Sequence, residues 1–165
     1  MDARDLLIDE FTRIQELYAD LASSSVDLHE RPSGSGNSMA WLLWHAARVQ
    51  DDHVAGVAGG GQAWDDFESR FALPFEHADI GYGHTSEEVS AVRIPDPALL
   101  IEYHAAVHQL TLSYLSRLTS EELDRVVDRR WDPPVTAGVR LVSVVGDCLQ
   151  HLGQAAYVRG LLTSS

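Results

Sequence analysis

The sequence is poor in basic residues. Its 12 Lys and Arg residues stand against 25 Asp and Glu, which gives a formal net charge of −13. Binding to nucleic acid or to an anionic membrane requires a basic face, so this balance excludes both classes of partner. A small molecule is the expected partner.

Cysteine and long apolar runs are also lacking. Cys148 stands alone, so an intramolecular disulfide framework is excluded, and the composition fits a reducing compartment. No apolar run approaches the ~20 residues that a membrane helix needs. The acidic first residues, MDARDLLIDEF, do not resemble a signal peptide. We therefore expect a cytoplasmic protein.

The sequence shows neither the alternating pattern of β-strands nor internal repeats. Apolar residues instead recur every three or four positions in four long stretches, which is the spacing of amphipathic helices. These predicted helices cover residues 3–22, 38–57, 97–118 and 139–162. A chain of 165 residues is long enough for one hydrophobic core, so we predict a single domain, 1–165, with an all-α fold and a four-helix bundle.

The connection between the second and third long helices, residues 58–95, is long and irregular. Short helices are predicted at 64–71 and after Thr85, where Thr85 and Glu88 have the spacing of a capping box. A connection of this length is usually functional or a packed lid. Residues 129–139, which contain two adjacent prolines, are predicted to form a loop.

Polar groups interrupt the apolar last helix near its middle. Asp147 and His151 are four residues apart and share one helix face, and Gln154 continues the same stripe. On the second helix, His45 lies on an apolar face. Cofactor sites in bundles are built from inward side chains of facing helices, so these residues could hold Zn²⁺ or a similar ion and leave a position open for water or substrate. The alternative is a structural hydrogen-bonded pair across the core.

Other polar residues are weaker candidates for chemistry. A structural role is expected for His104 and His108, which share a face with apolar residues. Cys148 is either an inert buried thiol or a soft ligand in place of Asp147. The pair Asp51–Asp52 either orients the imidazole of a ligand or lies at a solvated helix end. The remaining weak candidates are His53, His77 and His84.

Three segments resemble the DinB/YfiT-like superfamily of metalloenzymes. NSMAWLLWHAARVQDDHVAG resembles the second helix of that superfamily, and DCLQHLGQAAYVRGLL resembles its closing motif. Residues 64–93 resemble the actinobacterial branch, which includes relatives of thiol-dependent transferases and of the mycothiol-dependent maleylpyruvate isomerase. The resemblance covers most of the chain and implies a DinB-like four-helix bundle, often a homodimer.

The resemblance also implies a divalent metal, zinc or nickel, held by three histidines. His45 takes the first ligand position and His151 the third, whereas the second position is Asp147 instead of histidine. An aspartate can bind zinc, so a His/Asp/His site is one expectation. The other is a member of the superfamily that binds metal weakly or has lost it.

Three functions compete on this sequence. The first is a metal-dependent S-transferase that uses mycothiol or another thiol of low molecular weight, with Arg48 or Arg159 holding a carboxylate of the thiol. For both arginines the alternative is a salt bridge. The second function is a non-catalytic bundle with a polar core, and the third is metal-dependent hydrolysis.

Overall fold

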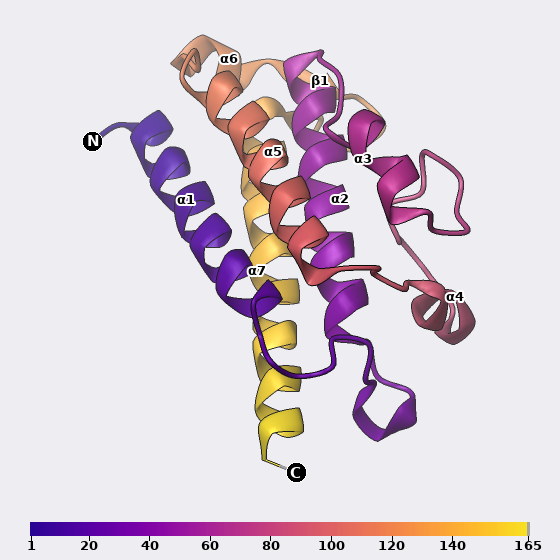
Figure 1. Cartoon of the computed structure of the whole chain (residues 1–165). Coiled ribbons are helices and arrows are strands. Elements are labelled where there is room, and N and C mark those ends of the chain that lie inside the picture. Colours follow the sequence, from indigo (N-terminus) through magenta and orange to yellow (C-terminus); the bar gives the residue numbers. More distant parts are fainter. Residues whose placement is uncertain (165) are drawn as a thin grey trace.

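The computed structural model describes residues 1–164 and confirms the all-α bundle (Figure 1). The four long helices are α1 (Ala3–Ala22), α2 (Met39–Ala58), α5 (Pro97–Leu115) and α7 (Ala137–Thr163). The expected polar residues begin these helices. The Ser38 hydroxyl accepts from Trp41 N at the start of α2, and Pro97 occupies the first turn of α5. Each predicted long helix is therefore present, with ends that differ by at most three residues.

The four helices enclose one hydrophobic core. Helix α1 packs against α5 and α7, and α2 packs against the same two helices. Helices α2 and α7 run antiparallel along their whole contact, as Figure 1 shows. Fully buried side chains from all four helices, such as Phe11, Leu43, Leu100 and Leu141, fill the interior. Within residues 1–164 no helix is long and apolar enough to cross a membrane.

The irregular connection contains the two short helices that the sequence predicts. These are α3 (Trp64–Phe71) and α4 (Ser86–Ala91), and α4 begins with the predicted capping box of Thr85 and Glu88. A 3-10 turn, η1 (Pro32–Gly34), precedes α2. The connection packs beside α2, and its aromatic side chains surround Trp44: Trp64 and Phe75 have ring centroids 6.3 and 5.7 Å from that ring. The expected packing of this segment is thus present.

The last connection differs from the prediction. After α6 (Ser120–Asp124), two short strands, β1 (Val126–Asp128) and β2 (Val135–Thr136), pair antiparallel and lead directly into α7. Part of the predicted loop 129–139 is therefore strand and helix. Strands of two and three residues are too short to show an alternating pattern in a sequence.

Candidate metal centre

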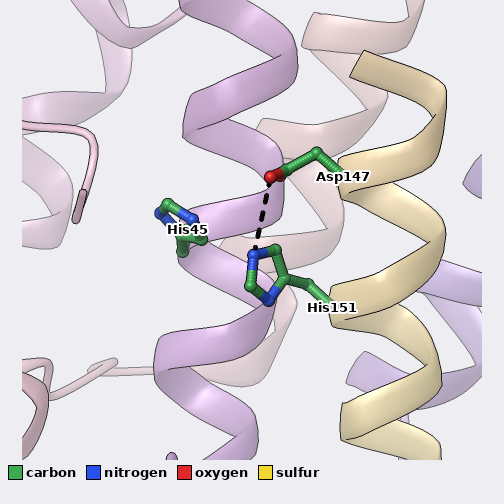
Figure 2. A group of neighbouring side chains, drawn as sticks. All are labelled: His45, Asp147 and His151. Atoms are coloured by element: carbon green, nitrogen blue, oxygen red, sulfur yellow. Dashed lines mark ion pairs between the residues drawn. The ribbon is translucent and has the colours of Figure 1, made fainter. Parts of the chain in front are cut away.

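His45, Asp147 and His151 meet in the seam between α2 and α7. Figure 2 shows the two α7 side chains and His45 of α2 directed toward one another. One ligand atom from each residue lies within 4.8 Å of the other two. His151 Nε2 is 3.7 Å from Asp147 Oδ1. Within residues 1–164 this is the one group of three such side chains close enough to share an ion.

His45 is held in a single orientation by its surroundings. Its Nδ1 donates to the carbonyl oxygen of Ile80, which leaves the lone pair of Nε2 available. The Trp41 ring stacks on the imidazole at a centroid distance of 4.6 Å and an interplanar angle of 15°. Burial lowers the pKa of His45, so the neutral form required of a metal ligand is favoured.

His151 is oriented in the same way from α7. The side-chain oxygen of Gln154, one turn later, accepts from His151 Nδ1 at 3.1 Å. Both imidazoles therefore bond to a protein acceptor through Nδ1, which leaves the lone pair of Nε2 available to a metal within the cluster. In metal sites the outer nitrogen of a histidine ligand almost always makes such a bond, which fixes the tautomer and the ring orientation.

Asp147 is the third candidate ligand, and the surroundings of its carboxylate suit a bound cation. Its Oδ2 is buried and has no hydrogen-bond partner among the described residues. A buried carboxylate oxygen without a partner is costly, and a bound cation would satisfy it. Two imidazole nitrogens and a carboxylate oxygen suit zinc, and three protein ligands leave a position open for substrate. The residues present therefore fit a divalent metal ion.

The cluster is open on one side. His45 is 4% exposed, whereas the Asp147 and His151 side chains are 36% and 18% exposed. A small molecule can thus approach from the α7 side, while the ring of Trp41 and the loop 77–84 close the other side.

The loop 77–84 follows α3 and forms the wall behind His45. Asp79 Oδ1 accepts from Gly81 N at 2.7 Å, and its carboxylate also accepts from His84 Nε2. His84 Nδ1 in turn accepts from Trp41 Nε1 at 3.1 Å. Gly81 has φ +89°, and a Cβ there would lie 2.8 Å from His45 Nδ1. Glycine at this position therefore lets the loop backbone reach the imidazole.

Arg48 anchors that loop from α2. Its guanidinium is fully buried and donates to the carbonyl oxygens of His77 and Asp79 and to the Gln62 side chain, at 3.2, 3.3 and 2.7 Å. Asp51 lies 3.8 Å from it and accepts from the backbone N–H groups of Ala63 and Trp64 at the start of α3. This positioning role of Arg48 was not predicted from the sequence. Its predicted binding of a thiol carboxylate stays a prediction.

The second predicted thiol-binding residue, Arg159, lies on the bundle surface. Its Nη1 is 2.7 Å from Asp20 Oδ2 on α1. Neither Arg159 nor Arg48 belongs to the three-residue cluster of candidate ligands. The role of Arg159 toward a thiol likewise stays a prediction.

The expectation that Asp51 or Asp52 orients a ligand imidazole is wrong. Asp51 binds the start of α3, and Asp52 accepts from Gln62 and pairs with His53. The acceptors at the ligand histidines are instead the Ile80 carbonyl and Gln154. Gln154 lies on the stripe visible in the sequence, but a backbone carbonyl leaves no trace in a sequence.

The other candidates are structural. His104 stacks on Tyr18 at 3.9 Å, bonds to Gln50 at 3.1 Å, and has its pKa lowered to about 3 by burial. Cys148 is fully buried, which raises the pKa of its thiol, and it faces the Ala46 carbonyl instead of the ligand cluster. His77 pairs with Glu68 at 2.8 Å on the surface. None of them joins the cluster.

Comparison with known proteins agrees with this fold. The sequence profile of the DinB superfamily matches residues 3–155, so the chain belongs to that superfamily. The solved structures include a conserved protein from Enterococcus faecalis with 33% sequence identity and a TM-score of 0.90. That match covers 100% of this chain and 99% of the other. No curated protein matches the chain. The relation to the actinobacterial branch stays a prediction.

Proposed function

We propose that this protein is a divalent-metal-dependent S-transferase that uses a thiol of low molecular weight, such as mycothiol. The observation that carries the proposal is the geometry of His45, Asp147 and His151. Both imidazoles bond to a protein acceptor through Nδ1, which leaves the lone pair of Nε2 for a metal, and the buried Asp147 Oδ2 has no hydrogen-bond partner among the described residues. A cation bound between the three side chains would satisfy that oxygen.

Different residues would bind the metal, orient its ligands and exclude water in such a site. A bound zinc or nickel ion would lower the pKa of a coordinated thiol and so provide a thiolate nucleophile at neutral pH. The Ile80 carbonyl and Gln154 hold the two imidazoles in the ligand tautomer. Trp41 and the loop 77–84 exclude water from the inner side, and the open α7 side admits the electrophile.

Two further proposals from the sequence accompany this one. The homodimer that the resemblance implies is supported by exposed apolar side chains along the outer face of α7, at Val142, Leu149 and Tyr157. A metal-dependent hydrolase would use the same three ligands without a thiol. Dependence of turnover on added thiol separates the hydrolase from the transferase.

Metal content is the first test. Protein purified without a His-tag or chelating resin should contain zinc or nickel near one ion per chain. His151→Ala should lose it, whereas His77→Ala, which removes an exposed histidine outside the cluster, should retain it. No metal in the wild type, even after addition of zinc or nickel, would contradict the proposal and leave a structural bundle.

A further inference from the structure

A second polar groove lies along the same α2–α7 seam. It has a volume of about 290 Å³ and contains three arginines, so we call it the arginine groove. Arg129 and Arg130 come from the turn between β1 and β2, and Arg140 comes from the first turns of α7. The other lining residues are Asp52, His53, Gly56, Val57, Val127 and Asp128.

Helix register places this groove in line with the candidate metal centre. Arg140 is seven residues before Asp147, and Asp52 is seven residues after His45. Residues seven apart share a helix face and are separated by about 10 Å along the axis. Helices α2 and α7 are antiparallel and packed together. The step from His45 to Asp52 and the step from Asp147 back to Arg140 therefore run in the same direction along the seam. The groove therefore lies about two turns from the three ligands, on the same seam.

The arginines of the groove are only partly neutralised. Asp128 is buried and accepts from Arg130 at 2.8 Å and from Arg140 at 3.2 Å. This is the only side-chain bond of Arg140 to a described residue, so its Nε and Nη1 remain available. Arg129 is exposed and makes no hydrogen bond or ion pair within residues 1–164.

The acidic residues of the groove do not cancel this charge. Asp52 is engaged by Gln62 Nε2 at 3.0 Å and by His53 Nδ1 at 2.9 Å. Three arginines therefore face two aspartates in a protein whose net charge is −13. A local excess of positive charge with free guanidinium donors is the chemistry that binds an oxyanion.

We propose that the arginine groove binds the carboxylate end of an elongated substrate whose reactive end lies at His45, Asp147 and His151. This proposal rests on the proposed function for the identity of the reactive end. The planar guanidinium of Arg140 matches a carboxylate. The three arginines and two aspartates of the groove leave a net charge of about +1, which one singly charged carboxylate neutralises. The substrate class is therefore a thiol or electrophile with a carboxylate about 10 Å from the reacting atom.

Carboxylate binding by the groove can be tested in zinc-loaded protein with two thiols that differ only in one end group. In 6-mercaptohexanoate, six bonds separate sulfur from the carboxylate carbon and span roughly 7 Å, and the Arg140 side chain supplies the remaining reach. 6-Mercaptohexan-1-ol has the same length without the charge. By calorimetry the acid should bind about tenfold more tightly than the alcohol, the effect of one charge-assisted hydrogen bond.

Substitutions assign that difference to the groove. Arg140→Gln should bring the two thiols to equal affinity. Arg129→Gln, at a side chain with no partner among residues 1–164, should reduce the difference without an effect on folding. Arg13→Gln changes the net charge equally, at an exposed residue paired with Asp9 on α1, and should leave the difference intact. Equal affinities of the two thiols for the wild type would overturn the proposal.

A measurement without metal separates this proposal from the proposed function. Hexanoate added to metal-free protein should shift the Nε–Hε NMR signals of Arg140 and Arg129, and hexan-1-ol should not. These shifts, together with failure of both thiols to bind the zinc-loaded protein, would support the groove and contradict thiol transfer. Absence of the shifts would overturn the groove even where the thiols bind zinc.

Discussion

Gly81 provides a direct test of how the loop 77–84 controls the candidate ligand His45. A Cβ added at Gly81 would lie 2.8 Å from His45 Nδ1 and 2.9 Å from Trp44 Cζ3. Neither ring can yield easily, because Trp44 is fully buried and His45 is stacked on Trp41. We therefore expect Gly81→Ala to push the Ile80 carbonyl away from the imidazole.

Gly83 offers a matched control in the same loop. It also has a positive φ, +75°, but a Cβ there would meet nothing within 4 Å. Both alanine variants adopt a left-handed backbone, at a cost of about 1–2 kcal/mol. Their difference therefore isolates the contact with His45 from the strain of the backbone.

The expected effect on metal binding follows from the lost support. Loss of the hydrogen bond behind a histidine ligand typically weakens metal affinity 10–100-fold, or about 1.4–2.7 kcal/mol. Gly81→Ala should show this loss, whereas Gly83→Ala should bind as the wild type does. Zinc affinity is measured by competition with a chromophoric chelator, and urea unfolding of the metal-free proteins reports the backbone cost separately.

Two outcomes would contradict this reasoning. If Gly81→Ala and Gly83→Ala bound zinc equally well, and both were destabilised alike, the loop would not fix the imidazole. If neither variant nor the wild type bound zinc, the proposed metal site itself would fail. A loss confined to Gly81→Ala would show that the Ile80 carbonyl acts through His45.

Three further predictions concern Asp147, Arg48 and His104. Asp147→His should raise zinc affinity, since it restores the three-histidine set that the resemblance implies; loss of stability with no metal bound would instead identify a core hydrogen-bond network. Arg48→Met should lower the free energy of unfolding by about 3–5 kcal/mol, because Asp51 would remain buried without its cation; unchanged stability with weaker thiol binding would favour the predicted thiol contact. For His104, the pKa of about 3 in the folded protein lies below the value of about 6.5 in the unfolded chain, so the unfolded chain takes up the proton first as the pH falls. Stability should thus fall between pH 6.5 and 4, and His104→Gln should reduce that slope by about 1 kcal/mol per pH unit, as urea titrations would show; an unchanged slope would contradict this assignment.

Local signals explain why the helices could be predicted from the sequence. Apolar spacing and capping interactions act over a few residues. The N-cap residues Ser38 and Thr85 mark the starts of α2 and α4. The strands β1 and β2 could not be predicted, since each is too short to alternate. The candidate ligands on the helices could likewise be predicted, from their spacing and the family resemblance.

The loop contribution to the site could not be predicted because it depends on contacts distant in the sequence. The Ile80 carbonyl reaches His45 only because Arg48 holds the carbonyls of His77 and Asp79, about 30 residues away along the chain. From the sequence, Asp51 and Asp52 on α2 were one candidate for the orienting role, with a solvated helix end as the alternative. The sequence could not show that Asp51 is occupied by the first N–H groups of α3.

These assignments give α2 two functions on neighbouring faces of one helix. His45 faces α7 and the candidate metal, while Arg48 and Asp51, three and six residues later, fix the loop that supports His45. The buried ion pair of Arg48 and Asp51 is costly to desolvate. It nevertheless connects the start of α3 and the loop 77–84 to the helix that carries the candidate ligand His45. A change at Arg48 should consequently reach the metal centre through the Ile80 carbonyl, although Arg48 contacts none of the three ligands.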